Sequence, residues 1–186
     1  MEELVTELAT ARLLLRPMQQ QDLALFTRLS CDPEVIQFIR EAPDAEALAE
    51  MFKTRCEPWF GAEGQWLCLT VIVTETQQAI GSVGLKLSCE KSRIAEVGYT
   101  FLPESQGKGY AREAVRCVFD FAFNGLQLHR VSALCDVDNH SSYKLMETMG
   151  MQREARLRDN YFRFGQHRDE YIYGILRSEW PAHAAG

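Results

Sequence analysis

The segment Gln106-Gly107-Lys108-Gly109-Tyr110-Ala111 lies between a predicted strand at residues 93–101 and a predicted helix. The helix is predicted because apolar residues recur at helical spacing, with charged residues on the opposite side. Two glycines at a strand-to-helix junction let the backbone turn sharply and bring bare N–H groups close to a ligand. Those donors and the positive end of the helix dipole form an anion site, so the segment predicts a bound phosphate.

The glycine spacing distinguishes this segment from other phosphate-binding loops. A dinucleotide-binding fingerprint needs a third glycine where Arg112 stands, and the G-x-x-x-x-G-K-[ST] pattern of a P-loop is absent. What remains is Q-x-x-G-x-A, which resembles the pyrophosphate loop of the GNAT superfamily of acyl-CoA-dependent N-acetyltransferases. A glycine-rich turn that merely caps a helix is the alternative for so short a pattern, so the rest of the chain must separate the two.

Two further segments resemble the same superfamily. Residues 95–99 (Ala-Glu-Val-Gly-Tyr) place an acidic residue, Glu96, on the strand ahead of the loop. Residues 138–142 (Asp-Asn-His-Ser-Ser), followed by Met149-Gly150-Met151, resemble the family's N-x-x-S…[LM]-G-[FM] segment. On these motifs the chain is identified as a member of the GNAT superfamily.

Two other segments are similar to the Rim-type branch of the superfamily, which includes the ribosomal-protein N-terminal acetyltransferases. They are Leu128-His129-Arg130-Val131 and Asp169-Glu170-Tyr171-Ile172-Tyr173. The resemblance as a whole covers residues 12–180, which is nearly the entire chain. It implies an acetyl-CoA-dependent N-acetyltransferase of Rim type.

Length and composition are those of one globular domain, expected over residues 1–186 with a loose tail at 181–186. The chain is 46% apolar, and its six cysteines show no C-x-x-C pair, which favours small buried thiols in a reducing cytoplasm over disulfides or zinc. The histidines show no metal-ligand spacing, so no metal is expected. A formal net charge of −6 disfavours non-specific nucleic-acid binding. No signal peptide or membrane span is visible, and a monomer or homodimer is expected.

The remaining elements follow from periodicity and turn signals. Helix starts are predicted at Asp22, at Asp32 with proline in its first turn, and at Asp44, the last of these reaching about Phe60. A short helix follows Asn139. Strands are predicted at residues 12–17, 66–74, 79–88, 94–101, 130–137, 151–157 and 170–176.

These elements predict the fold class. A strand, a helix and a second strand across the glycine loop imply a parallel pair, whereas hairpins elsewhere imply antiparallel strands. The expected fold is therefore α/β (α+β) with a mixed sheet, and the resemblance implies the GNAT fold, with helices on both faces and a splayed central parallel pair. Trp59, Phe60 and Trp66 are expected in the core, and the alternative is that one of them lines the substrate cleft. The polar and aromatic segment 160–168 is expected to be a loop that contacts substrate or only closes a hairpin.

The resemblance implies how acetyl-CoA, the expected cosubstrate, is bound. Backbone N–H groups of the glycine loop are expected to hold the pyrophosphate, and an open strand edge suits the extended pantetheine arm. A backbone N–H near Thr100 or Phe101 is expected to stabilise the oxyanion. The expected cofactor-binding residues are Tyr99, Thr100, Phe101, Gln106, Gly107, Lys108, Gly109, Tyr110, Ala111, Arg112 and Asn139.

Glu96 is the candidate general base. A lysine-type amine with a pKa of about 10.4 is rarely neutral at pH 7, whereas an α-amine near about 8 is cheaper to deprotonate, so a base matters more for the former. The alternative is that Glu96 is a carboxylate on a sheet face, paired with a neighbouring strand.

Ser142 is the candidate for hydrogen bonding the CoA thiol sulfur. Many family members place a tyrosine acid where Met146 stands here, so the usual proton donor is missing. A serine that caps its own helix is the alternative for Ser142. A thiolate with a pKa of about 8.5 can also leave without an acid.

The acceptor is expected to be a primary amine, and the sequence leaves its identity open. A protein N-terminus is suggested by the Rim-type resemblance, whereas a small-molecule amine such as a polyamine, an aminoglycoside or an amino acid is the alternative. A non-catalytic acyl-CoA-binding module, with Met146 as a sign of lost chemistry, is the competing hypothesis from a different class.

Overall fold

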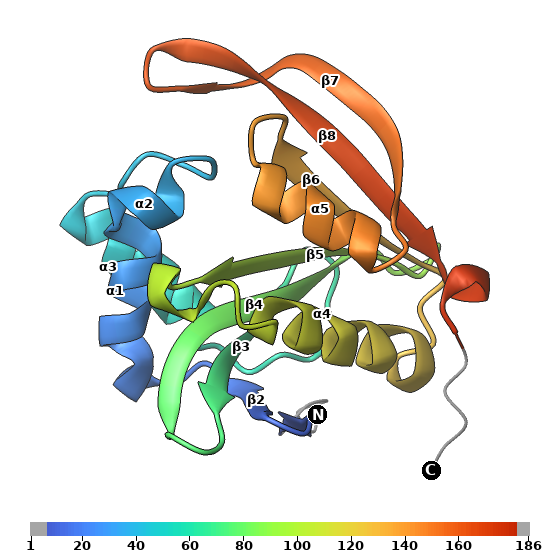
Figure 1. The fold of residues 1–186 in the computed structure, drawn as a ribbon, viewed down its shortest axis with the longest axis horizontal. Coiled ribbons are helices and arrows are strands. Elements are labelled where there is room, and N and C mark those ends of the chain that lie inside the picture. The colour runs from blue at the N-terminus through green and yellow to red at the C-terminus, as the bar shows by residue number, and fades with distance from the viewer. Residues whose placement is uncertain (1–6, 182–186) are drawn as a thin grey trace.

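The computed structural model describes residues 7–181, so most of the expected tail at 181–186 lies outside the described part. Its centre is one eight-stranded sheet in the order β1-β2-β3-β4-β5-β6-β8-β7 (Figure 1). The strands are β1 (Leu8–Ala9), β2 (Leu13–Pro17), β3 (Trp66–Val73), β4 (Gln78–Cys89), β5 (Ile94–Phe101), β6 (Arg130–Asp136), β7 (Gln152–Arg163) and β8 (Gln166–Leu176).

Helices cover both faces of this sheet (Figure 1). α1 and α3 pack on the face that carries Cys68, and α4 and α5 pack on the face that carries Leu67. Within residues 7–181, no helix is long and apolar enough to cross a bilayer. The α-helices are α1 (Leu23–Cys31), α2 (Pro33–Ile36), α3 (Ala45–Arg55), α4 (Tyr110–Asp120) and α5 (His140–Thr148), with shorter helical turns at Gln20–Asp22, Pro103–Ser105, Phe121–Gly125 and Arg177–Glu179.

The parallel pair is formed by β5 and β6, which come before and after α4 along the chain, as the sequence predicts. Its ladder is short: Ile94 to Glu96 pair with Arg130 to Ser132, and no further pairs follow. The other strand pairs of the described sheet are antiparallel. The mixed fold with a splayed central pair is therefore confirmed.

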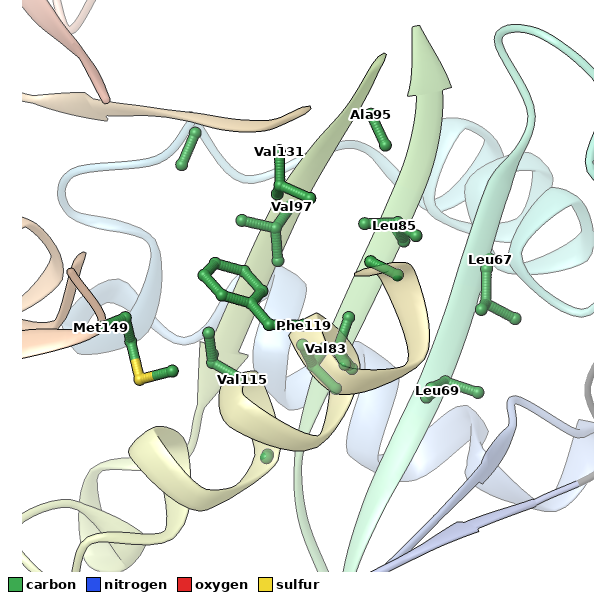
Figure 2. Close-up of a cluster of buried hydrophobic side chains, with 14 of the residues drawn as sticks. Leu67, Leu69, Val83, Leu85, Ala95, Val97, Val115, Phe119, Val131 and Met149 are labelled. Atoms are coloured by element: carbon green, nitrogen blue, oxygen red, sulfur yellow. The ribbon is translucent and has the colours of Figure 1, made fainter. Parts of the chain in front are cut away.

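The main core lies between the sheet and α4. Figure 2 shows Val115 and Phe119 of α4 directed at apolar side chains of the strands, among them Val83 and Val97. Phe119 is fully buried and meets the indole of Trp180 edge-on, at 5.2 Å between ring centroids. This packing fixes α4, and with it the glycine loop, against the middle strands.

Capping residues fix the starts of α2 and α3. The Asp32 carboxylate accepts from the Glu34 N–H at 3.0 Å, and that of Asp44 accepts from the Ala47 N–H at 2.8 Å. The expected end of the third helix near Phe60 is wrong, because α3 stops at Arg55. Pro58 disfavours helical conformation in the residue before it and offers no N–H, so the helix ends ahead of it.

The expected loop at residues 160–168 is also wrong. β7 and β8 stay paired as far as Arg163 and Gln166, so that only Phe164 and Gly165, both with positive φ, make the turn. The hairpin projects beyond the rest of the sheet toward the segment after α2 (Figure 1), where the Phe164 N–H donates to Glu41 at 2.6 Å. Because the outer hairpin is mostly exposed, its side chains lack the apolar alternation by which a strand is recognised.

The three aromatic residues expected in the core differ in outcome. Trp59 is buried, whereas Phe60 is 39% exposed and Trp66 is only half-buried. The cysteines are free thiols, of which Cys135 is buried and the others are half-buried. The expectation of a buried core therefore holds for Trp59 and Cys135 but is wrong for Phe60.

Replacing Phe119 with alanine should lower the free energy of unfolding by about 3–5 kcal/mol, since it leaves a cavity between α4 and Trp180. Urea unfolding measured by circular dichroism checks this. Phe162→Ala, the same change at a 63% exposed ring, should cost far less; equal losses for the two variants would contradict the assigned core.

Candidate active site

A cleft of about 630 Å³ opens where β5 and β6 diverge. Its walls come from both faces of the sheet: α1, α2 and the end of α3 on one side, and the starts of α4 and α5 on the other. Glu96 to Phe101 line it continuously, because the β5–β6 ladder ends at Glu96 and leaves the residues after it without a neighbouring strand on that edge. The cleft thus passes through the sheet rather than over it.

The glycine loop forms one end of this cleft. Gly107 and Gly109 have φ of 72° and 80°, a backbone conformation that costs other residues about 1–2 kcal/mol. The first backbone bond of α4 runs from the Glu113 N–H to the Gly109 carbonyl at 3.1 Å. The N–H groups of Tyr110, Ala111 and Arg112 consequently have no helical acceptor and remain available for an anion.

A side chain that the sequence analysis missed anchors this loop. Arg12 donates to the Lys108 carbonyl at 3.2 Å, forms an ion pair of 2.6 Å with Glu113, and lies over the Tyr110 ring. Burial opposes ionisation of Glu113, but hydrogen bonds from Thr10 and Arg12 outweigh it and lower the pKa of this carboxyl. Nothing in the local sequence around Arg12 signals this role, because its partners lie far along the chain.

Lys108 is the one predicted site residue that does not line the cleft. Its carbonyl faces Arg12 instead, as just described. The other predicted residues converge on the same cleft, although they come from three separate segments. They are Glu96, Tyr99, Thr100, Phe101, Gln106, Gly107, Gly109, Tyr110, Ala111, Arg112, Asn139 and Ser142.

The open edge of β5 presents backbone donors to the cleft. The N–H of Leu102 donates to Ile80 of β4 at 3.0 Å, which sets the phase of hydrogen bonding along β5. Because that phase alternates, the N–H groups of Tyr99 and Phe101 point away from β4 and toward the gap, whereas that of Thr100 points to β4. Of the two candidates for an oxyanion donor, Phe101 therefore fits and Thr100 does not.

Tyr99, Ser142 and Cys135 meet at the start of α5. The Tyr99 hydroxyl lies 3.1 Å from both the carbonyl and the Oγ of Ser142, and the Cys135 thiol also contacts Ser142. Burial raises the pKa of Tyr99 above its ordinary value and that of Cys135 to about 12. Both groups are therefore protonated at neutral pH, and Cys135 is no thiolate nucleophile.

Asn139 caps α5. Its side-chain oxygen accepts from the Ser142 N–H at 3.1 Å and the Ser141 hydroxyl at 3.0 Å. The cap is thus supplied by Asn139, so the alternative in which Ser142 caps its own helix does not describe this structure. The amide NH2 of Asn139 is left as a donor on the cleft wall.

Glu96 lies on the α1–α3 face of the gap and is ion-paired across strands. Its Oε2 is 2.7 Å from the Nζ of Lys86, which also lies 5.1 Å from the centre of the Trp66 ring. The indole covers Gly84 and Gly98, where an added Cβ would lie 3.2 Å from ring atoms. Trp66 is part of the cleft wall, the alternative to a place in the core, because two glycines make room for its ring.

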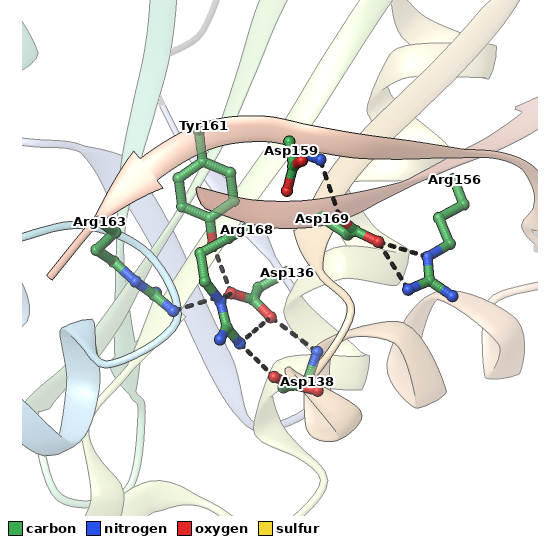
Figure 3. A network of polar contacts seen from close by, with 8 residues as sticks. All are labelled: Asp136, Asp138, Arg156, Asp159, Tyr161, Arg163, Arg168 and Asp169. Atoms are coloured by element: carbon green, nitrogen blue, oxygen red, sulfur yellow. Dashed lines mark hydrogen bonds and ion pairs between the residues drawn. The ribbon is translucent and has the colours of Figure 1, made fainter. Parts of the chain in front are cut away.

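A network of polar contacts centred on the buried Asp136 lies beside the cleft, at the end of β6 (Figure 3). The Asp136 carboxylate, at 0% side-chain exposure, accepts from Tyr161 at 2.5 Å, from Arg163 at 2.9 Å and from Arg168 at 3.3 Å. Arg168 also pairs with Asp138. Burial opposes ionisation of Asp136, but hydrogen bonds from Tyr161, the Asp138 N–H and Arg168 outweigh it and lower its pKa. The network ties the long hairpin to the end of β6.

Comparison with known proteins identifies a matching family and several similar N-acetyltransferases. Residues 12–152 match the family model described as an acetyltransferase (GNAT) domain. The chain is 32% identical to "Uncharacterized N-acetyltransferase p20" of Bacillus licheniformis over 182 residues, which covers 97% of this chain and 99% of that protein. It is 34% identical over 100 residues, 54% of this chain and 55% of the relative, to "Putative ribosomal N-acetyltransferase YdaF" of Bacillus subtilis.

A solved structure with the same fold contains ligands. It is the spermidine N-acetyltransferase of Vibrio cholerae in complex with CoA and spermine, with a TM-score of 0.80 and 25% identity. The match covers 91% of this chain and 98% of that one.

Replacing Asp136 with asparagine should cost about 3–5 kcal/mol at pH 7, since it leaves Arg163 buried without its counter-charge. The stabilisation by the wild-type carboxylate is complete above its ordinary pKa of about 3.9 and is lost as pH falls through the lower folded-state pKa. Unfolding measured from pH 7 to pH 2 should accordingly be less pH-dependent in the variant. Asp159→Asn on the exposed hairpin is the control.

Replacing Gly109 with aspartate should weaken CoA binding by about a hundredfold or more, because it puts a side chain and a negative charge beside the backbone N–H groups that are expected to bind the pyrophosphate. Titration calorimetry checks affinity, and thermal unfolding checks that the domain still folds. Gly165→Asp makes the same change at a positive φ in the hairpin turn and should bind CoA normally. Near-normal affinity of the Gly109 variant would refute the phosphate site.

Proposed function

The chain belongs to the acetyltransferase (GNAT) domain family and is an N-acetyltransferase, and we propose that it transfers acetyl from acetyl-CoA to a primary amine in the gap between β5 and β6. The single observation that supports this site is the cleft itself. It runs from the unpaired N–H groups at the start of α4 to the unpaired edge of β5. Acetyl-CoA supplies an acetyl group activated as a thioester.

The residues for binding fit this cosubstrate. Backbone N–H groups of Gly107 and Gly109 to Arg112 would hold the pyrophosphate, since side chains are absent where the two glycines approach it. The β5 edge from Tyr99 to Phe101 would bind the amide groups of the pantetheine arm as an added strand would, with Asn139 donating from the opposite wall. The N–H of Phe101 would stabilise the oxyanion.

Glu96 is the base in this proposal. Its carboxylate faces the cleft beside the first unpaired position of β5, where an amine has to arrive. The ion pair with Lys86 also fits the alternative in which Glu96 is a sheet-face carboxylate paired with a neighbouring strand. To take the proton, the carboxylate therefore has to release Lys86 or act through water.

Ser142 is the residue that meets the departing thiolate in this proposal. Met146, at the usual tyrosine position, is buried and carries no proton to donate. The Ser142 hydroxyl lines the cleft, and the Tyr99 hydroxyl 3.1 Å behind it is held in its protonated form. Ser142 would donate a hydrogen bond to the sulfur and keep its proton, and the thiolate, with an ordinary pKa of about 8.5, can leave without an acid where the usual tyrosine is missing.

Two acceptor classes have support among the relatives. A protein N-terminal α-amine, the Rim-type activity, is favoured by the partial similarity to the putative ribosomal acetyltransferase. A small-molecule amine is favoured by the similarity to the spermidine enzyme over nearly the whole chain. That the relatives are named N-acetyltransferases favours catalysis over acyl-CoA binding alone. Release of CoA thiol when amines and acetyl-CoA are combined tests the function directly.

Glu96→Gln should lower kcat by about 10²–10⁴-fold if Glu96 is the base, with the largest loss at low pH, where the amine is hardest to deprotonate. The pH–rate profile with a saturating amine measures this. Glu154→Gln, which removes an ion-paired glutamate outside the cleft, is the matched control. A profile that is unchanged in the Glu96 variant would remove this residue as the base.

A further inference from the structure

Two arginines line the wall of the cleft that is formed by the end of α3 and the segment after α2, and neither has a carboxylate partner. Arg55 ends α3, with its guanidinium 4.9 Å over the Trp66 ring and Nη1 at 3.5 Å from the Cys68 sulfur. Arg40, after α2, has its Nη1 at 4.0 Å from the Met51 sulfur. Both line the cleft, and among the ion pairs within residues 7–181 none involves either one.

This arrangement is unfavourable for the empty protein. Burial and the like charge of Arg55 both lower the pKa of Arg40. The neighbouring Cys68 does not offset the two charges, since burial raises its pKa and keeps the thiol neutral. A partly buried cation without a partner costs free energy, so the pair of arginines calls for an anion that the chain does not provide.

The carboxylates of the cleft are engaged elsewhere or face solvent. Glu96 is paired with Lys86, and Asp136 with the arginines of the hairpin. Glu170 accepts from Asn160 at 2.6 Å, and Glu34 is on the exposed side of α2. The wall formed by the end of α3 and the segment after α2 therefore presents positive charge to an incoming substrate.

We propose, building on the function proposed above, that the acceptor is a primary amine carrying a carboxylate, which Arg40 and Arg55 bind while its amino group meets Glu96. The Trp66 indole contacts both Arg55 and Lys86, the partner of Glu96, so the two arginines and the base lie along the same wall of the cleft. A guanidinium fork matches a carboxylate in charge and geometry. A polyamine would bring further ammonium groups against the same wall and be disfavoured.

The first experiment compares acceptors that differ only in the far group. 5-Aminopentanoate, 5-aminopentanamide and 1,5-diaminopentane share one carbon chain and end in a carboxylate, an amide and an ammonium. Release of CoA thiol should give a kcat/KM for the carboxylate about ten- to a hundredfold above that for the amide, with the diamine lowest. The dipeptides Ala-Glu-amide and Ala-Gln-amide test whether the carboxylate can come from a peptide beside its N-terminus.

The second experiment removes the charges. In Arg55→Gln and Arg40→Gln, the KM for 5-aminopentanoate should rise about tenfold or more, whereas that for the amide should change little. Lys53→Gln takes the same charge from an exposed position on α3, outside the cleft, and should leave the preference intact. Titration of CoA-saturated protein with 5-aminopentanoate measures the same anion binding without turnover.

The outcomes separate this inference from the function on which it builds. If 1,5-diaminopentane is acetylated as efficiently as 5-aminopentanoate, in wild type and variants alike, the carboxylate site at Arg40 and Arg55 is overturned but the acetyltransferase function stands. Arginine-dependent binding of the carboxylate without acetylation of any amine supports the anion site and rejects this catalytic site. Neither binding nor turnover rejects both.

Discussion

The early end of backbone pairing between β5 and β6 is the constraint on which the rest of the structure depends. Three residue pairs join the strands at Glu96 and before it, and the strands then separate. Unpaired N–H groups normally cost free energy when buried, so an open edge inside a sheet persists only where solvent or a ligand satisfies it. The gap brings the two faces of the sheet into one cleft, with anion donors at the start of α4 on one side and a positively charged wall on the other.

The charges around the gap are balanced unevenly. Asp136 forms ion pairs with two arginines, Arg163 and Arg168, and these pairs fix the long hairpin to the end of β6. Glu96 forms an ion pair with Lys86, which an arriving amine would displace if Glu96 is the base, as we propose. Arg40 and Arg55 have no carboxylate partner among the described residues. The paired charges hold the walls in place, and in our proposal the two arginines select an anionic substrate, since a buried charge without a partner binds an opposite charge most strongly.

Features with local causes were predictable from the sequence. The glycine loop, the caps at Asp32 and Asp44, and the alternation of buried residues along β6 depend on residues a few positions apart, so their patterns can be recognised in a single chain. The sequence predicted the inner parts of β7 and β8 but not their extension to Arg163 and Gln166, because the exposed outer parts of these strands lack that alternation. The end of α3 was misplaced although Pro58, which disfavours a helix, lies between Arg55 and the expected end near Phe60.

By itself the sequence determined the strand–loop–helix unit around Gly107 and Gly109, the mixed sheet and the segments that meet at the cleft. Only the tertiary structure decided which side chains act together there. Arg12 reaches the glycine loop from the start of the chain, and Trp66 lies over Gly84 and Gly98 beside Arg55. Such contacts join residues far apart along the chain, and no local periodicity or spacing encodes them, because they arise only once the strands are in register and the helices are packed.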